Sequence, residues 1–387
     1  MIIHIENKIA LNNLILNLMN DNYQIISKKE LDLNYNQIEI DLNKYKYLSF
    51  DFDDKKSEIV ILSNNISGLV LEYNELTKTN DIYLSINNYD DYGKVENFKL
   101  IDAKNLYYRK DKSKNINVLL PRNYDENKKY GVIIMFDSQN IFDKRKVGNY
   151  TDKNDPYGGW QVETSLLNIS RLYNYEYIVV GIENADEYRE MELTPSQEYV
   201  KFKKELLSLE DNNLLNGKLD DLGNFINETL LPFVKSKYNV DINELGIVGS
   251  SCGGLASFYL GLRDYLNYKF IFTFTPATGF IEGSSLIELY KKIDFRKNND
   301  KLPYIFYYQG NKGELEHLLY TINQNLLSLL YENGYKKELI DEYIELSAEH
   351  NETMWRYGFN YAIIKYIEKN RWVIWMKMNI KKRQWEL

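Results

Sequence analysis

The stretch that most constrains the fold is Gly-Ile-Val-Gly-Ser-Ser-Cys-Gly-Gly at residues 246–254. An apolar run leads into it, and the sequence Leu-Ala-Ser-Phe-Tyr-Leu that follows is typical of the start of a helix. The pattern Gly-x-Ser-x-Gly centred on Ser251 therefore lies between a predicted strand and a predicted helix, which predicts a tight, strained turn with an exposed serine hydroxyl. Because strand and helix backbones crowd together in such a turn, the residues two places before and after the serine must lack a Cβ.

Two adjacent serines compete for the central position of this turn. Ser251 has Gly249 and Gly253 in the two crowded places, whereas Ser250 has a valine and a cysteine there. Only Ser251 fits, so we take it as the candidate nucleophile. Glycine and serine are common in loops, so the motif needs support from a partner elsewhere in the chain.

Composition excludes several classes of function. With 387 residues the chain can form one large or two ordinary domains. The net charge of −8 argues against a nucleic-acid partner. No run approaches the roughly 20 apolar residues of a membrane span, and the N-terminus does not resemble a signal peptide, so we expect no membrane partner. The composition leaves the oligomeric state open.

The cysteine and histidine content bears on disulfides, cellular location and metal binding. The single cysteine, Cys252, excludes an internal disulfide and agrees with a cytoplasmic location. The three histidines, His4, His317 and His350, are too few and too scattered for a histidine-based metal site. We therefore expect neither a metal nor another cofactor.

The first part of the chain, residues 1–104, has the pattern of a β-rich domain. Apolar and polar residues alternate at 38–42, 48–52 and 82–86, with turn-forming residues between the runs. This predicts a small antiparallel domain of the sandwich type, with a short helix near residues 8–19. Its tyrosines are open to two interpretations. They could form a carbohydrate- or partner-binding face, but tyrosine is also a common strand residue, and we favour the second interpretation.

The second part, residues 105–387, has a different pattern. Apolar runs at 115–121, 130–136, 177–182, 245–248 and 304–308 show little alternation, and helical patterns such as 222–237 separate them. Continuous apolar strands alternating with helices predict an α/β domain with a mostly parallel sheet and helices on both faces. In such sheets the active site lies at the carboxyl ends of the strands.

Several motifs in this second part resemble those of one family. They are Asp-Ser-Gln-Asn-Ile-Phe-Asp at 137–143, Gly-Gly-Trp at 158–160, Val-Gly-Ile-Glu-Asn at 180–184, Arg-Glu-Met-Glu-Leu-Thr-Pro at 189–195, Gly-Ser-Ser-Cys-Gly-Gly at 249–254 and His-Asn-Glu-x-x-Trp at 350–355. From about Leu106 to about Ile367, the chain resembles the putative esterase family of α/β-hydrolases. That family includes enterochelin, feruloyl and acetyl-xylan esterases, S-formylglutathione hydrolases and mycolyl transferases. The resemblance implies an α/β-hydrolase fold.

The resemblance also implies a catalytic base. A serine hydroxyl is a poor nucleophile until a base removes its proton. His350 follows Ser251 by about a hundred residues, in the order serine, acid, histidine that this fold uses. The alternative is that His350 is a surface loop histidine. His317 lies in a helical pattern and is expected to be an ordinary helix residue.

The third member of a catalytic triad is harder to place. It should follow the predicted strand 304–308, where family members often have Gly-x-x-Asp or Gly-x-x-Glu. Counted from Gly310, the matching position is Gly313, so Glu314 comes one residue late. We favour Glu314, then Glu316, and either could instead be a carboxylate at a helix N-terminus. A serine–histidine dyad without an acid is the third possibility.

An oxyanion hole requires two backbone N–H groups. One is expected from Cys252, the residue after the nucleophile, and the other from Ser138 or Gln139 in the loop after residue 136. Two positions depart from the family pattern, since Ser138 replaces a usual glycine and Cys252 stands where methionine is commoner. We expect the Cys252 side chain to pack rather than react.

Three further residues are candidates for the substrate pocket. Trp160, Arg189 and Trp355 lie in the family motifs, and each could equally have a structural role. Arg189 in particular has glutamates close to it in the sequence and could form ion pairs with them.

The sequence thus predicts a serine carboxylic-ester hydrolase that acts through an acyl-enzyme on a small or carbohydrate-linked ester. An acyltransferase on the same fold is one alternative, because the sequence does not show whether water or an alcohol accepts the acyl group. A non-catalytic glycan-binding protein is the other.

Overall fold

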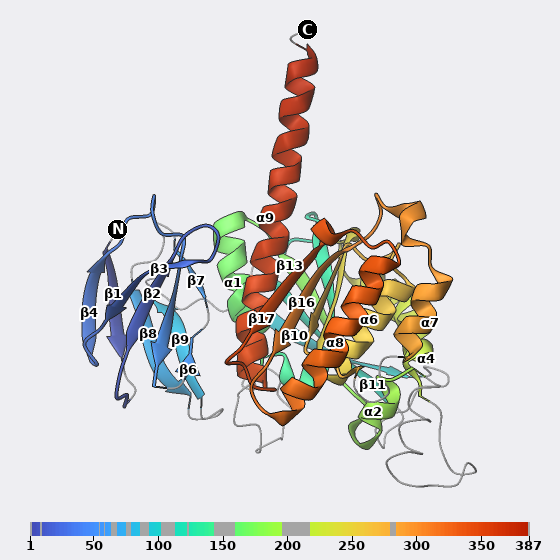
Figure 1. Ribbon diagram of the computed structural model, residues 1–387, viewed down its shortest axis with the longest axis horizontal. Helices are drawn as coiled ribbons and strands as arrows, with labels where there is room; N and C mark the ends of the chain where they lie inside the picture. The colour runs from blue at the N-terminus through green and yellow to red at the C-terminus, as the bar shows by residue number, and fades with distance from the viewer. Residues whose placement is uncertain are drawn as a thin grey trace. The chain divides into compact units, whose positions relative to one another are not determined.

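A computed structural model describes most of the chain, and Figure 1 shows its helices and strands. The described residues are 2–7, 10–53, 55–57, 59–62, 68–74, 79–85, 93–101, 113–121, 124–142, 159–195, 217–278 and 284–385. The chain divides into two compact units, Met1–Tyr92 with Phe142–Tyr175 and Arg356–Leu387, and Gly93–Ile141 with Glu176–Trp355. We call them the sandwich unit and the α/β unit. The predicted limits, 1–104 and 105–387, remain a prediction, and the compact units follow a different division of the chain.

The sandwich unit contains two sheets. In the described residues their strand orders are β4-β1-β8-β9 and β3-β2-β5-β6, with β7 also paired to β5. The strands are β1 (Ile2–Asn7), β2 (Ile15–Met19), β3 (Ile25–Glu30), β4 (Tyr35–Glu39), β5 (Tyr47–Phe52), β6 (Lys55–Lys56), β7 (Val60–Ile61), β8 (Gly68–Asn74) and β9 (Thr79–Ser85). Every pairing is antiparallel except that of β1 with β8.

Side chains from both sheets form one core, which is the arrangement of a sandwich. Alternate residues of a strand point to one face, and Leu16 and Leu18 of β2 meet Leu48 and Phe50 of β5 in this way. The helix predicted near residues 8–19 is wrong over its second part, because residues 15–19 form β2. Residues 8 and 9 lie outside the described residues.

Among its described residues the sandwich unit has two helices, α1 (Val162–Tyr173) and the part of α9 (Glu352–Trp385) that begins at residue 356. One carboxylate of α9 joins them to the strands. Glu368 accepts hydrogen bonds from the hydroxyls of Tyr47 at 2.5 Å, Tyr173 at 2.6 Å and Tyr23 at 3.4 Å. These tyrosines come from β5, α1 and the turn after β2, so one side chain connects three distant segments.

The α/β unit contains one large sheet, which in the described residues has the order β10-β11-β13-β12-β14-β15-β16-β17. Its strands are β10 (Gly93–Ile101), β11 (Ser113–Pro121), β12 (Tyr130–Phe136), β13 (Tyr177–Ile182), β14 (Val240–Ser250), β15 (Phe270–Phe274), β16 (Tyr304–Gly310) and β17 (Ile340–Glu345). The pairs β10–β11 and β11–β13 are antiparallel and the remaining pairs are parallel. The predicted α/β-hydrolase fold with its mostly parallel sheet is confirmed.

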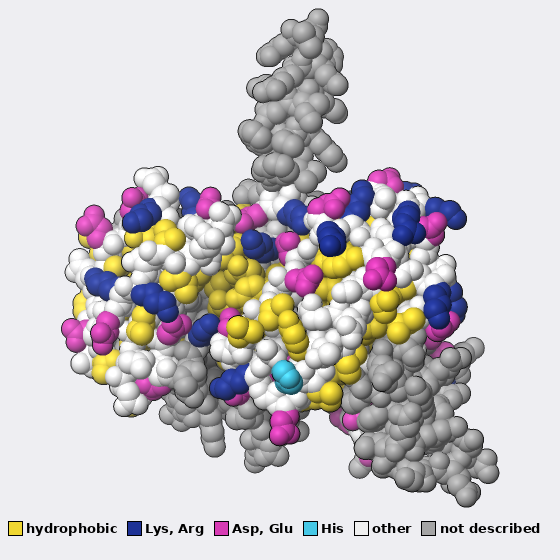
Figure 2. Space-filling model, viewed as in Figure 1, with side chains coloured by type: hydrophobic (Ala, Val, Ile, Leu, Met, Phe, Trp, Pro, Cys, Tyr) yellow, Lys and Arg dark blue, Asp and Glu magenta, His cyan; other side chains and the backbone are white. Residues whose placement is uncertain are grey.

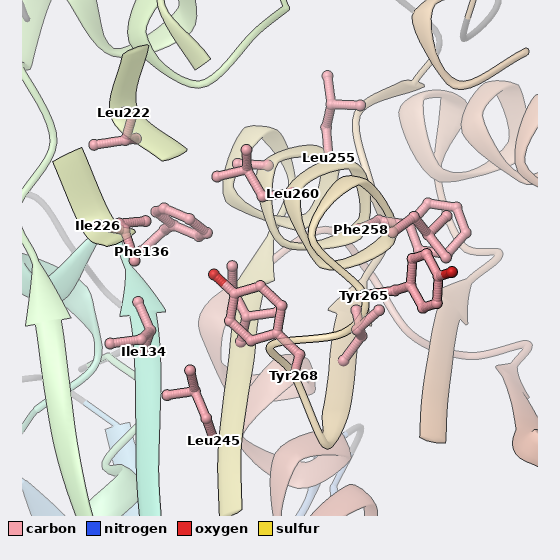
Figure 3. Packing of buried hydrophobic residues seen from close by; sticks show 14 of the residues in the cluster. Ile134, Phe136, Leu222, Ile226, Leu245, Leu255, Phe258, Leu260, Tyr265 and Tyr268 are labelled. Carbon is pink, nitrogen blue, oxygen red and sulfur yellow. The ribbon is translucent and has the colours of Figure 1, made fainter. Parts of the chain in front are cut away.

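The described helices of the α/β unit accompany this sheet. They are α2 (Arg189–Glu192), α4 (Leu219–Phe225), the π-helical η4 (Ile226–Leu230), α5 (Leu231–Lys237), α6 (Cys252–Arg263), α7 (Ser284–Lys292) and α8 (Glu314–Glu332), with short 3₁₀ turns η1 (Ser138–Asn140), η2 (Asp186–Tyr188), η6 (Phe295–Asn298) and η7 (Lys337–Leu339). Of these, α6 and α8 pack directly on the sheet. Figure 3 shows side chains such as Phe136, Ile226 and Leu260 filling the space between helices and sheet. Successive residues of β12 from Val132 to Met135 are all buried, so both faces of the sheet are covered.

The register of the parallel strands brings their carboxyl ends to one edge. Phe136 pairs with Ile182, Ser250 with Phe274, and Phe274 with Tyr308. The loops that follow β12, β13, β14 and β16 therefore start side by side, which is where sites form in such sheets.

Candidate active site

Ser251 occupies the turn between β14 and α6 in a strained conformation. Its φ is 53° and its ψ is −123°, outside the regions that non-glycine residues ordinarily occupy. A Cβ on Gly249 would lie 2.1 Å from the Gly253 carbonyl oxygen, and one on Gly253 would lie 2.9 Å from Asp137 Oδ2. The turn therefore meets the steric requirement that the sequence indicated. Ser250, by contrast, is the last residue of β14 and is buried.

Backbone hydrogen bonds hold this turn in place. The Ser251 N–H donates to the Phe274 carbonyl at 3.0 Å, and the Ser251 carbonyl accepts from the N–H of Leu255 and of Ala277, each at 2.9 Å. The serine is thereby fixed to β15, to α6 and to the loop after β15. A turn held from three sides can keep a strained residue, which is a common property of catalytic positions.

His350 lies in the loop between β17 and α9 and is held by an acid. Its Nδ1 lies 2.8 Å from Glu316 Oε1, and the Glu316 side chain is fully buried. Gln309 Nε2 donates to the other carboxylate oxygen at 2.8 Å, and Asn323 Nδ2 donates to Gln309 Oε1 at 2.7 Å. The carboxylate is thus fixed by a chain of buried amides, and it fixes the imidazole in turn.

The acid beside His350 is therefore Glu316, whereas the sequence favoured Glu314. Glu314 is exposed at the first residue of α8. The two glutamates differ because they lie on different faces of α8. Glu316 lies on the buried face, at helical spacing from its other members, which are Leu319, Asn323, Leu326, Leu327 and Leu330. The sequence carried this signal in the spacing of those residues.

The first turn of α9 completes the surroundings of His350. Asn351 immediately precedes the helix, and its Oδ1 accepts from the Met354 N–H at 3.1 Å, as an N-cap does. The Trp355 ring lies edge-on to the imidazole with 4.9 Å between centroids. The structure therefore brings Trp355 to His350. His317, in contrast, is exposed on α8 with its Nδ1 3.3 Å from Asn311 Oδ1.

The loop after β12 carries the other predicted oxyanion donors. Asp137 is left-handed, with φ 57° and ψ 46°, and the short turn η1 starts at Ser138. Ser138 is buried, and its hydroxyl accepts a hydrogen bond from Asn117 Nδ2 of β11 at 2.8 Å. In the order of the sheet, β11 and β14, the strand that precedes Ser251, lie on opposite sides of β12. Gln139 Oε1 lies 3.4 Å from the Asn184 N–H.

Arg189 pairs with Asp137 rather than with the glutamates near it in sequence. Arg189 Nε donates to Oδ1 at 2.7 Å and Nη2 donates to Oδ2 at 2.8 Å. Asn184 Nδ2 adds a third hydrogen bond to Oδ1 at 2.6 Å. Asp137 and Asn184 were not among the predicted site residues, although both lie inside the family motifs, and an aspartate at a strand end was the available signal.

Burial and ion pairing shift the pKa values of three residues at this site. Burial raises the pKa of the Asp137 carboxyl, but Arg189 and Asn184 outweigh it, so this pKa lies below its ordinary value. Burial lowers the pKa of Arg189, and the Asp137 carboxylate reverses that effect and raises it. Burial raises the pKa of the Cys252 thiol. The thiol therefore stays protonated at neutral pH, while Asp137 and Arg189 stay charged.

Trp160 lies in the sandwich unit. Its buried ring packs edge-on against Phe359 of α9, with 6.2 Å between centroids. The carbonyl of the preceding residue, Gly159, accepts from Arg356 Nη2 at 2.8 Å, which joins the Gly-Gly-Trp motif to the residue that follows the motif at 350–355. A role for Trp160 or Arg189 in a substrate pocket stays a prediction. Asp143 and Gly158, at the ends of two motifs, lie outside the described residues.

The described ranges show neither metal-binding clusters nor membrane-spanning helices. Those residues contain no group of three or more histidine, cysteine, aspartate or glutamate side chains that could hold a metal ion. No helix among them is long and apolar enough to cross a membrane. Figure 2 shows acidic and basic side chains interspersed over the visible face.

Comparison with known proteins identifies the family. The model of the family described as "Putative esterase" matches residues 109–365, which is more than half of the chain. No curated protein matches the sequence. Siderophore hydrolase EstA from Aspergillus nidulans has a similar structure, with a TM-score of 0.50 and 14% identity over 71% of this chain and 95% of that chain.

Two further solved structures are comparable. Siderophore hydrolase EstB from Aspergillus nidulans has a TM-score of 0.49 and 17% identity over 71% of this chain and 96% of that chain. The BES protein from Bacillus cereus has a TM-score of 0.47 and 17% identity over 69% of this chain and 94% of that chain. At such identities these likenesses concern the fold alone. The match to the family model, together with the motifs at the sheet edge, shows that the chain belongs to the putative esterase family.

Proposed function

We propose that the protein hydrolyses a carboxylic ester through an acyl-enzyme on Ser251. The observation that carries this proposal is the hydrogen bond between His350 Nδ1 and the buried Glu316 carboxylate, at the sheet edge that also holds the strained Ser251. A carboxylate on Nδ1 orients the ring and leaves Nε2 to accept a proton from a serine hydroxyl.

In the proposed reaction, Ser251 Oγ attacks the ester carbonyl carbon while its proton passes to His350 Nε2. The carbon becomes tetrahedral and its oxygen becomes negative. The imidazolium then gives the proton to the leaving alcohol, and the C–O bond of the ester breaks to leave an acyl-serine. Water attacks this intermediate in the same way, with His350 as base, which releases the acid and restores Ser251.

The negative oxygen of each tetrahedral intermediate needs hydrogen-bond donors. We assign them to the backbone N–H of Cys252, in the first turn of α6, and to that of Ser138 or Gln139. Both segments follow neighbouring strands, β14 and β12, which supports this assignment. Fixed donors of this kind typically contribute about 3 kcal/mol each to transition-state stabilisation.

Glu316 supports the charge that His350 gains in each step. Because the Glu316 side chain is fully buried and its second oxygen is held by Gln309, the carboxylate is oriented before the reaction begins. An oriented carboxylate stabilises the imidazolium without reorganisation. We propose Glu316 as the third member of the triad in place of Glu314.

For the substrate we propose a small or carbohydrate-linked ester, which follows from the family motifs. A panel of p-nitrophenyl, feruloyl and acetyl-sugar esters would define the acyl and alcohol parts. Product analysis with a sugar acceptor present would show whether an alcohol replaces water in the second step.

The decisive experiment is labelling with a fluorophosphonate probe followed by mass spectrometry. We expect one labelled residue, Ser251, together with loss of labelling and of ester turnover in Ser251→Ala. Ser250→Ala is the matched control, since it removes the neighbouring hydroxyl, and it should retain labelling. Retained turnover in Ser251→Ala would show that the proposed site is wrong. Glycan binding by a wild-type protein without turnover would favour a binding module.

A further inference from the structure

Asp137 is a buried, charged residue to which the proposed reaction gives no step. It follows β12 directly and precedes the residues to which we assign one oxyanion donor. Its left-handed backbone sets the direction in which the next two N–H groups point. A non-glycine residue keeps such a conformation when its surroundings hold it there.

Arg189 and Asn184, which follow β13 in the chain, hold Asp137 in this conformation. The guanidinium binds the Asp137 carboxylate with two parallel hydrogen bonds of 2.7 and 2.8 Å, a geometry that fixes both groups in one plane. Asn184 contributes a further bond of 2.6 Å. The carboxylate is buried, whereas the Arg189 side chain is 31% exposed. The Asp137 carboxylate is thus held inside the protein, while part of the Arg189 side chain faces solvent.

The same carboxylate also lies close to the nucleophile turn. A Cβ placed on Gly253 would lie 2.9 Å from Asp137 Oδ2, so the first turn of α6 passes directly against this oxygen. That turn carries the Cys252 N–H, the second proposed oxyanion donor. An anion beside a helix N-terminus is also electrostatically favourable. One carboxylate therefore contacts the structures that carry both donors.

We propose that the Asp137–Arg189 pair is a positioning device that fixes the distance between the two halves of the oxyanion hole. The inference rests on the proposed ester hydrolysis. Arg189 acts through Asp137 and not on the substrate. Loss of the pair should therefore weaken binding of the transition state far more than binding of the ester.

The test uses Arg189→Met, Asp137→Asn and the double variant in the full-length protein. We expect each single variant to lower kcat about 100-fold, as the loss of one oxyanion donor does, with KM changed less than about threefold. Because the two residues act as a unit, the double variant should lose about as much as either single variant. Arg189→Lys keeps the charge without the two parallel bonds and should recover only part of the loss.

Two further measurements separate positioning from general damage. A trifluoromethyl ketone, which forms a tetrahedral oxyanion on the serine, should bind more weakly by the factor that kcat/KM loses. Amide hydrogen exchange should rise in the peptides covering residues 137–142 and 251–255. The control is Arg263→Met, which breaks a comparable pairing with Asp220 and Asp264 at the other end of α6 and should leave kcat within about twofold.

Two outcomes would overturn the inference. In the first, Arg189→Met keeps wild-type kcat and wild-type exchange in both peptides. In the second, it raises only KM, and only for negatively charged esters, which would make Arg189 a substrate-binding residue. A wild-type protein that turns over no ester would refute the proposed function instead, and the exchange measurement would still decide whether the pair fixes the two segments.

Discussion

At the scale of single residues, the clearest question is whether Glu316, the acid beside His350, takes part in catalysis. Glu316→Gln keeps the shape of the side chain but removes the charge that supports the imidazolium. We expect kcat to fall by about 10³- to 10⁴-fold, with little change in KM. Glu314→Gln is the matched control two residues away on the exposed face of α8, and it should stay within about twofold of wild type. The measurement is steady-state hydrolysis of p-nitrophenyl acetate.

Equal and small losses in the two glutamine variants would contradict this assignment and indicate a serine–histidine dyad. Burial weighs against that outcome. A carboxylate that is fully buried against an imidazole is costly to maintain, and Gln309 and Asn323 form a chain of amides that reaches it.

Alkylation and substitution of Cys252 test whether the side chain after the nucleophile takes part in the chemistry. The thiol is buried and its pKa is raised by burial, so the reactive thiolate is scarce at neutral pH. We expect iodoacetamide to modify Cys252 only after denaturation, as read by mass spectrometry. Cys252→Ala should keep most of the activity, because the oxyanion donor is a backbone N–H. Rapid alkylation of the native protein with loss of activity would reverse this interpretation.

Asp137 predicts a pH dependence of stability. Its pKa is lowered in the folded protein, so above the ordinary value of about 3.9 the unfolded chain and the native protein are both ionised and the full stabilisation is present. As the pH falls through the folded pKa, that stabilisation is lost. The gap in unfolding free energy between wild type and Asp137→Asn should therefore be constant from pH 7 to 5 and shrink below about pH 4. Urea titrations at several pH values measure it, and a gap that does not shrink at all as the pH falls below 4 would contradict the prediction.

Whether a site residue could be predicted depends on whether its evidence lies in the neighbouring sequence or in contacts made only on folding. Ser251 could be selected from local sterics alone, since glycine is needed on both sides of one serine. His350 required only chain order. Glu316 was ranked second because counting from Gly310 ignores the phase of α8, which is set by packing. The partnership of Arg189 with Asp137 joins two loops, and nothing in the local sequence of either specifies it.

At the scale of elements, the strand–turn–helix around Ser251 is the most constrained. Gly249→Ala places a methyl group 2.1 Å from a backbone oxygen of α6, so strand and helix must separate. We expect a loss of about 2–4 kcal/mol in unfolding free energy and loss of fluorophosphonate labelling. Gly313→Ala is the control, since its Cβ would meet nothing within 4 Å and only its positive φ opposes the change. Normal labelling of Gly249→Ala would show that the turn relaxes more easily than its geometry implies.

The strands that the sequence patterns found are buried, but burial did not ensure a prediction, since the fully buried strand β15 was missed. Strands β11, β12, β13 and β16 are nearly continuous apolar runs and were predicted, as was the helical stretch from α4 to α5. Strand β17, Ile-Asp-Glu-Tyr-Ile-Glu, is an edge strand with alternating charges and was not predicted. Edge strands lack the apolar signal because one side of each is unpaired. The misassigned helix over β2 shows the same ambiguity for short apolar segments.

At the scale of the whole molecule, the sandwich unit is assembled from segments that the sequence separates by hundreds of residues. Residues before 92 supply the strands, residues 142–175 supply α1, and the C-terminal segment supplies α9. Composition and periodicity predicted a β-rich N-terminal region but gave no sign that two distant helices join it. Such contacts depend on side chains like Glu368, whose partners cannot be read from local sequence.

The Glu368 cluster gives the last prediction. Burial and the nearby carboxylate raise the pKa of Tyr23, Tyr47 and Tyr173 well above the ordinary value, so their hydroxyls stay protonated and donate. Glu368→Ala leaves three largely buried hydroxyls without this acceptor and should lower the unfolding free energy of the sandwich unit by about 3–5 kcal/mol. Hydrogen exchange should then rise in β5 and α1 together, because one carboxylate joins both to α9.

Glu342→Ala is the matched control, since it removes a tyrosine–glutamate hydrogen bond, that of Tyr331 at 2.8 Å, on the exposed surface of the α/β unit. It should cost less than about 1 kcal/mol and leave exchange in β5 and α1 unchanged. If Glu368→Ala raises exchange in α1 but not in β5, the strands hold together without the helix, and the three segments are not one cooperative unit. Joint exposure of β5 and α1 at a single free energy would instead show that the first and last parts of the chain unfold together.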